Sequence, residues 1–107
     1  MLDFWATWCG PCIAELDEVQ KFYETIRDSS NNKIILLTIA CHDNKIKVYS
    51  HLRESNYTFP VAMSDDKIEK IFSIYGLPSK ILITPEGNYL RVSDSDWVGF
   101  VKEICDL

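Results

Sequence analysis

Apolar residues recur along the chain in two patterns, and the alternation of these patterns predicts the order of the secondary-structure elements. Steps of three and four residues indicate amphipathic helices, whereas short continuous apolar runs indicate buried strands. Turn-forming residues separate the patterns at 28–32 and again at 85–88. The predicted strands cover 1–5, 34–40, 57–63, 81–84 and 89–92, and the apolar stripes of four predicted helices cover 13–26, 46–52, 68–75 and 97–104.

The same spacing predicts which side chains each helix buries. The expected inward residues are Ile13, Leu16, Val19, Tyr23 and Ile26 in the first helix, Ile46, Tyr49 and Leu52 in the second, Ile68, Ile71, Phe72 and Tyr75 in the third, and Trp97, Val101 and Ile104 in the last. Asp65 or Asp66 is expected to begin the third helix and Gly76 to end it. The last helix is expected to begin near Ser95. Because Pro60 lacks a backbone donor, we expect its strand at an edge of the sheet.

The order β-α-β-α-β-α-β-β-α predicts an α/β fold in which helices cover both faces of one mixed sheet. A chain of 107 residues fits a single domain over 1–107. Residues 1–5 have the pattern of the middle of a strand, so we expect an upstream segment to be missing from this chain. In such sheets, sites form where a strand ends and a helix begins.

Charge and the distribution of apolar residues exclude several function classes. Eleven lysines and arginines against 16 aspartates and glutamates give a formal net charge of −5, which argues against a nucleic-acid partner. The chain has no apolar run long enough to cross a bilayer and no signal peptide at its start. Four cysteines, of which two are closely spaced, do not make a disulfide-stapled small domain.

The sequence Cys9-Gly10-Pro11-Cys12 falls where the first strand gives way to the first helix. The start of a helix has unpaired N–H groups and a positive dipole end, which both favour a thiolate. Pro11 fits the first turn of a helix, where its missing N–H costs no hydrogen bond. Cys12 lies one turn further and is expected to be less exposed than Cys9. We therefore predict that Cys9 attacks a partner disulfide and that Cys12 resolves the resulting mixed disulfide.

The segment "DFWATWCGPC" resembles the active-site segment of thioredoxin-fold thiol–disulfide oxidoreductases. Over 43–90, the order of elements with the "FPV", "YGLPS" and "ITPEG" steps resembles the TlpA/ResA-like branch of bacterial envelope proteins. The resemblance implies a three-layer α/β/α sandwich with an extra helix and strand inserted, and with N-terminal strands absent from this chain.

This resemblance also implies an activity and its setting. It implies an enzyme that reduces or isomerises protein disulfides, without a bound cofactor or metal, and Gly-Pro between the cysteines is similar to the reducing members. The implied partners are substrate proteins and an upstream electron-donor protein, and the chain is expected to be a monomer. The implied location is the bacterial periplasm or cell envelope, with the cytoplasm as the alternative. A non-catalytic binding module with the same fold is the alternative function.

The resemblance assigns roles to residues outside the cysteine pair. Pro78 matches the cis-proline that faces the pair, and the main chain of Leu77 is expected to bind a substrate strand. Trp8 is expected to be an exposed docking face, while Trp5 packs under the loop. Asp3 matches a buried acid that handles the proton of the second cysteine, since burial raises a carboxyl pKa. Gly10 and Pro11 complete the predicted substrate-binding set.

Two departures from the family pattern accompany this assignment. The lysine that partners the buried acid in thioredoxins has no secure counterpart in 38–41. The acid that some cytochrome-maturation members place after the cis-proline is also missing, because Ser79 and Lys80 follow Pro78.

Other readings of the cysteines make different structural predictions. A zinc site would join Cys41 and His42 to the pair as a four-ligand set. Haem attachment needs a histidine where Ile13 stands, and a peroxiredoxin needs serine or threonine where Ala6 stands. Cys41 and Cys105 are interpreted as small core residues, with an auxiliary thiol role for Cys41 as the alternative. His42 and His51 are expected at the surface.

Overall fold

The computed structural model describes residues 1–29, 33–93 and 95–106, and its helices and strands follow the predicted order. The elements are β1 (Leu2–Trp5), α1 (Gly10–Asp28), β2 (Leu37–Ala40), α2 (Lys45–Glu54), β3 (Val61–Met63), α3 (Lys67–Ile71), β4 (Ser79–Ile83), β5 (Tyr89–Val92) and α4 (Trp97–Ile104). The loop predicted over 28–32 lies mostly outside the described residues. In the hairpin, Gly87 adopts φ 90° and its N–H donates to the Thr84 carbonyl at 3.0 Å, as a turn there requires.

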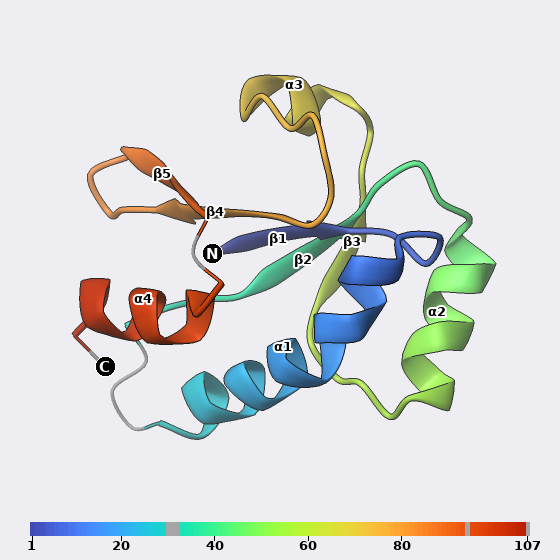
Figure 1. Ribbon diagram of the computed structural model, residues 1–107, viewed down its shortest axis with the longest axis horizontal. Helices are drawn as coiled ribbons and strands as arrows, with labels where there is room; N and C mark the ends of the chain where they lie inside the picture. The colour runs from blue at the N-terminus through green and yellow to red at the C-terminus, as the bar shows by residue number, and fades with distance from the viewer. Residues whose placement is uncertain (30–32, 94, 107) are drawn as a thin grey trace.

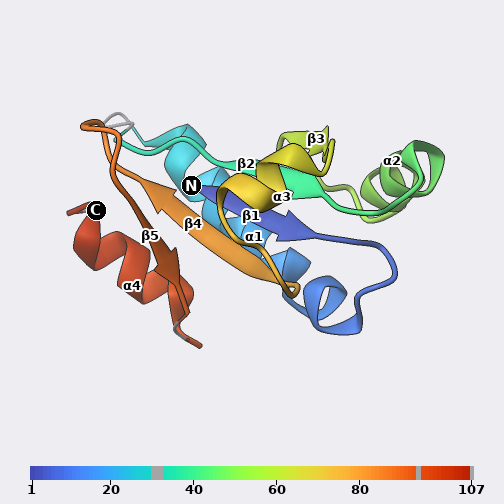
Figure 2. The ribbon, with the colours of Figure 1, turned by 90° about the horizontal axis from the view of Figure 1, so that it is seen from above.

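One mixed sheet with the strand order β3-β2-β1-β4-β5 forms the middle layer. β2 runs parallel to β1 and to β3, whereas β4 runs antiparallel to β1 and to β5. The strand after Pro60 lies at the edge, as predicted. Figure 1 shows α3 on one face of the sheet and α1 with α4 on the other, and Figure 2 shows α3 over the middle strands. This is the expected three-layer α/β/α arrangement, with α2 and β3 as the inserted pair.

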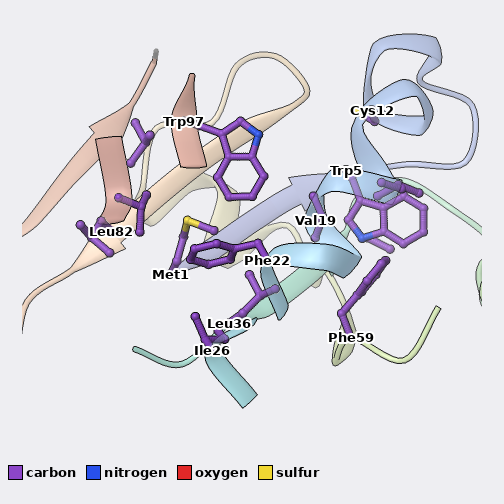
Figure 3. Close-up of a cluster of buried hydrophobic side chains, with 14 of the residues drawn as sticks. Met1, Trp5, Cys12, Val19, Phe22, Ile26, Leu36, Phe59, Leu82 and Trp97 are labelled. Atoms are coloured by element: carbon purple, nitrogen blue, oxygen red, sulfur yellow. The ribbon is translucent and has the colours of Figure 1, made fainter. Parts of the chain in front are cut away.

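Side chains alternate along β1, so this central strand feeds two separate cores. Phe4 packs with Ile39 and Ile81 beneath α3. Trp5 belongs to the larger core between the sheet and α1, which Figure 3 shows with Cys12, Phe22 and Trp97 among its members. By the same alternation, Asp3 lies on the face that α1 covers. β1 therefore introduces a carboxyl group into a largely apolar layer.

The face of α2 that packs on the core differs from the predicted one. Ile46 and Tyr49 are 77% and 43% exposed, whereas Val48 and Leu52 are buried in the larger core. Each of the two pairs fits a helical stripe, because residues three or four apart lie on the same side of a helix. The sequence of α2 therefore contains two neighbouring apolar stripes, either of which could be buried. In the folded structure the stripe through Val48 packs into the larger core with residues of α1. The prediction for Leu52 is confirmed, and those for Ile46 and Tyr49 are wrong.

α3 is shorter than predicted because a Schellman motif ends it at Phe72. Ser73 adopts a left-handed φ of 52°, its N–H donates to the Lys70 carbonyl, and the Ile74 N–H donates to the Glu69 carbonyl at 2.8 Å. The guanidinium of Arg91 donates to the carbonyls of Phe72 and Ser73. Gly76 therefore does not end the helix. As a consequence, Ile71 is exposed and Tyr75 is 94% exposed, where both were expected in the core.

Smaller differences occur at the other element boundaries. Ile34, Ile35 and Leu36 precede β2 instead of belonging to it, and β3 begins at Val61 instead of at residue 57. Tyr23 is half-buried, and Ile104 is exposed. Asp96, not Ser95, caps α4 by accepting the Gly99 N–H at 3.1 Å. At the start of α3, Asp66 occupies the N-cap position but its side chain makes no capping hydrogen bond. The Asp65 carboxylate instead accepts hydrogen bonds from the N–H groups of Lys67 and Ile68.

A bilayer-spanning helix, which must be both long and apolar, is not found among residues 1–29, 33–93 and 95–106.

Two substitutions in α2 test which of its faces supports the fold. Val48→Ala removes two buried methyl groups and is expected to lower the free energy of unfolding by about 2 kcal/mol. Ile46→Ala, on the exposed stripe, is expected to change it by less than about 0.5 kcal/mol. Urea denaturation of the oxidised protein measures both values. A larger loss from Ile46→Ala would contradict the packing of α2.

Candidate active site

Cys9 is the N-cap of α1, and its own sulfur accepts a hydrogen bond from the helix. The Cys9 N–H closes the preceding turn by donating to the Ala6 carbonyl at 3.2 Å, and α1 begins at the next residue. The Cys12 N–H donates to Cys9 Sγ at 3.2 Å. Pro11 lies in the first turn, as predicted. A thiolate at position 9 would thus receive an N–H donor and the positive end of the helix dipole.

The two cysteines form a disulfide and differ in exposure. Their Cα atoms are 5.2 Å apart, within the usual range for a disulfide. Cys9 is 7% exposed and Cys12 is 0% exposed. Both cysteines are thus largely covered, but the exposed surface of the pair belongs to Cys9, while Cys12 lies in the core with Leu16. This is the asymmetry that the sequence predicts.

The loop that carries the pair is fixed to the segment after β2. The Thr7 backbone N–H donates to Asp43 Oδ2 at 2.6 Å, and the Thr7 hydroxyl donates to the same carboxylate at 2.8 and 2.9 Å. The Trp8 indole N–H donates to the His42 carbonyl at 2.8 Å. Sequence reasoning missed Asp43, because its partner Thr7 is 36 residues away. These bonds hold Trp8 at the mouth of the site with 61% of its surface exposed, while Trp5 is buried below.

The predicted substrate-binding residues divide between two hollows. A hollow of about 540 Å³ is bordered by Cys9, Trp8, Gly10, Pro11 and Leu77, together with residues of 42–76; we call it the cysteine hollow. The Leu77–Pro78 peptide bond is cis, as expected. Pro78 itself borders a smaller hollow of about 180 Å³ on another side, with Lys80 and Trp97.

Asp3 is buried and has a cationic neighbour. It is 1% exposed, and Lys80 Nζ lies 3.3 Å from Asp3 Oδ1. Burial raises the pKa of Asp3 to about 7, although the Lys80 charge acts in the opposite direction. The partner lysine does not come from 38–41, where thioredoxins have theirs. β4 supplies it, because Lys80 stands directly opposite Asp3 in the antiparallel pairing with β1.

Lys80 connects Asp3 to Glu15 of α1. Its ammonium forms an ion pair with Glu15 and lies 4.9 Å from the centre of the Trp97 ring, and only 5% of its side chain is exposed. Burying an ammonium is costly unless it is paired, and here two carboxylates and an aromatic face surround it. Sequence reasoning did not assign Lys80 or Glu15 to the site. The sequence signal that could have identified Lys80 is its position at the start of an otherwise apolar strand.

The fold does not bring together the four residues that a zinc site would use, which are Cys9, Cys12, Cys41 and His42. Cys41 packs beneath α3 with Phe4, on the opposite face of the sheet from Cys9 and Cys12. Burial raises the pKa of Cys41 to about 12, which disfavours its thiolate. His42 faces carboxylates instead, with Nε2 3.0 Å from Glu69 and Nδ1 3.7 Å from Asp66.

The remaining predictions for cysteines and histidines have mixed outcomes. Cys105 is a free, half-buried thiol. His42 is exposed, as expected. His51 is half-buried, with its ring 6.4 Å from that of Trp5 and 6.1 Å from that of Tyr57.

A central β1 strand that leads into a CxxC pair at a helix N-terminus, together with a cis-proline directly before the start of β4, defines a thioredoxin-fold dithiol site. The chain belongs to the Thioredoxin-like family, whose model matches residues 1–89. It is 29% identical over 92 residues to thiol-disulfide oxidoreductase ResA of Bacillus subtilis, covering 85% of this chain and 50% of that protein. These findings confirm the ResA-like resemblance.

Solved structures show the same fold. StoA from Bacillus subtilis matches with a TM-score of 0.71 and 27% identity, over 82% of this chain and 66% of that one. The exposed lipoprotein thioredoxin Etrx1 of Streptococcus pneumoniae matches with a TM-score of 0.78 and 18% identity, over 99% and 82% of the two chains. The chain spans about half the length of the curated relatives it matches.

Two substitutions that are expected to shift the Asp3 pKa in opposite directions test the electrostatic surroundings of this residue. Lys80→Met removes the cation that lowers the Asp3 pKa, so this pKa is expected to rise by about one pH unit. Glu15→Gln removes an anion that raises the Asp3 pKa, so this pKa is expected to fall. Carboxyl ¹³C NMR titration of the oxidised protein measures both shifts. Lys67→Met, on the surface, serves as the control, and shifts of the same sign in the two variants would contradict the arrangement.

Proposed function

We propose that this chain is a thiol–disulfide oxidoreductase that uses the Cys9–Cys12 couple to reduce or isomerise disulfides in other proteins. The observation that supports this most directly is the hydrogen bond from the Cys12 N–H to Cys9 Sγ at the start of α1. It gives the sulfur of Cys9 a donor and a favourable dipole, while the second sulfur lies within bonding distance. The named activity of the relatives, disulfide oxidoreduction, supports the same assignment.

The exchange proceeds in two balanced steps. In the reduced protein, the Cys9 thiolate attacks one sulfur of a substrate disulfide. The substrate S–S bond breaks, its second sulfur leaves as a thiolate that takes up a proton, and a mixed disulfide with Cys9 forms. Cys12 then attacks Cys9 Sγ and releases the substrate as a dithiol. Two electrons pass to the substrate, and the chain acquires the Cys9–Cys12 disulfide, which a donor dithiol must reduce again.

Asp3 is proposed to accept the proton that Cys12 loses before its attack. Both groups are buried in the layer between the sheet and α1. A carboxyl group whose pKa is about 7 can take up and release a proton near neutral pH. Burial is the main cause of this raised pKa, and Lys80 and Glu15 adjust it in opposite directions.

Substrate binding is proposed to use the borders of the cysteine hollow. Trp8, Gly10 and Pro11 provide a surface beside Cys9, and the Leu77 main chain is available to an extended segment of the substrate. The partners are substrate proteins and a donor protein, with this chain acting as a monomer in the bacterial cell envelope. The resemblance to the ResA-like proteins supports this setting.

Trapping of the intermediate tests the proposal and the roles of the two sulfurs. Cys12→Ser leaves the attacking sulfur but removes the resolving one, so incubation with insulin is expected to leave a covalent adduct through Cys9. Non-reducing mass spectrometry identifies the adduct and its linkage. Cys105→Ser, which changes a thiol outside the site, is the control and is expected to leave insulin reduction unchanged.

Two outcomes would count against the proposal. Adducts found only in Cys9→Ser would reverse the roles of the cysteines. An absence of adducts, together with no reduction of insulin by the wild-type chain, would favour the non-catalytic binding module.

A further inference from the structure

We propose that a second hollow beside the redox site binds a lysine or arginine side chain of the substrate, close to the substrate cysteine that Cys9 attacks. This inference rests on the proposed function and specifies the class of substrate. The second hollow, of about 370 Å³, is lined by His42, Asp66, Glu69, Lys70, Ile74 and Tyr75. We call it the acidic hollow.

The acidic hollow adjoins the cysteine hollow. His42, Glu69, Ile74 and Tyr75 border both. A substrate segment that lies across Cys9 along the Leu77 main chain is extended, and its side chains point alternately to opposite sides. A long side chain within a few residues of the reactive cysteine can therefore enter the acidic hollow. The two hollows form one binding surface with separate places for sulfur and for a neighbouring side chain.

Tyr75 is the aromatic residue shared by the two hollows. It is 94% exposed, because the Schellman motif after α3 turns the chain outward before Gly76. On the same surface, Trp8 is held by its bond to the His42 carbonyl. An exposed tyrosine ring at the border of a carboxylate-lined hollow favours an ammonium or guanidinium group, which aromatic faces attract.

The charges in the acidic hollow also favour a cation. Its lining contains the carboxylates of Asp66 and Glu69, the ammonium of Lys70, and His42, whose two ring nitrogens each face one of the carboxylates. The Glu69 carboxylate is oriented by the Ser64 hydroxyl and by His42 Nε2. The Asp66 side chain is 65% exposed, so it is open to an incoming group. The chain as a whole carries a net charge of −5, which adds to the attraction of a basic segment.

A basic side chain fits this hollow better than a metal ion does. His42, Asp66 and Glu69 offer ligand atoms within 4.8 Å of one another. However, the two carboxylates face different nitrogens of His42, and a metal ion would need them both beside the same nitrogen. An ammonium or guanidinium group needs no such convergence, since its several N–H donors can bind the two carboxylates without a fixed coordination geometry.

Peptide substrates that differ in one charge test the inference. Each ten-residue peptide has one cysteine as a mixed disulfide with 2-mercaptoethanol, flanked by lysine, acetyl-lysine or glutamate two residues away on either side. The rate constant for reduction by the wild-type chain is expected to be about threefold higher for the lysine peptide than for its acetylated form. The glutamate peptide is expected to be the slowest. Because salt screens exposed charges, the preference is expected to shrink at about 0.5 M salt.

Three substitutions assign this preference to the acidic hollow. Asp66→Asn is expected to reduce the preference for lysine, and Lys70→Gln to increase it. Glu86→Gln makes the same charge change as Asp66→Asn in the distant β4–β5 turn, so it is expected to leave the preference unchanged. Tyr75→Leu is expected to slow the lysine peptide more than the glutamate peptide.

The outcomes separate this inference from the proposed function. Equal reduction of all three peptides would overturn the inference and leave the oxidoreductase in place. An equal effect of Glu86→Gln and Asp66→Asn would also overturn it, by assigning the preference to net charge alone. Calorimetry with zinc chloride tests the metal alternative. If zinc binds to the wild-type chain but not to Asp66→Asn, and if bound zinc abolishes the preference for lysine, the hollow is a metal site and the inference is overturned. Failure to reduce any peptide would contradict the proposed function itself.

Discussion

The site depends on one contact, the hydrogen bond from the Cys12 N–H to the sulfur of Cys9 at the first turn of α1. This contact requires that β1 end, the chain turn at Ala6, and the helix begin at Gly10. The same geometry brings two sulfurs within bonding distance and leaves the second one in the core. Under the proposed function, the local backbone that begins the helix thus supplies the attacking sulfur, a donor for its charge, and the resolving sulfur.

The central position of β1 links this helix start to a buried acid. Alternation along β1 places Trp5 and Asp3 on the face covered by α1, and antiparallel pairing with β4 places Lys80 opposite Asp3. Burial raises the pKa of Asp3, and the lysine limits that increase. A charged pair in such a layer contributes little net stability, because desolvation offsets its attraction. Its physical consequence is a buried carboxyl group with a pKa of about 7 on the face of the sheet that α1 covers.

Much of this could be predicted from local sequence. The order of the elements followed from apolar spacing and the cysteine pair from its CxxC motif, whereas Asp3 and the cis-proline loop followed from the resemblance to thioredoxin-fold proteins. What could not be predicted depends on contacts between distant segments. Lys80 reaches Asp3 only through strand pairing, and Asp43 reaches Thr7 only through the loop after β2. Tyr75 fits a helical stripe, but the turn at Ser73 ends α3 earlier and exposes it. The choice between the Ile46 and Val48 stripes was likewise made by tertiary packing.

The most direct test of the central claim is the pH dependence of Cys9 alkylation in the reduced protein. Iodoacetamide rates, followed by peptide mass spectrometry, give the midpoint for Cys9 in the folded chain and in the same chain unfolded in urea. The account predicts a folded midpoint at least about one pH unit below the unfolded one, with Cys12 nearly unreactive in the folded state. Equal midpoints in the two states, or equal reactivity of the two cysteines, would contradict it.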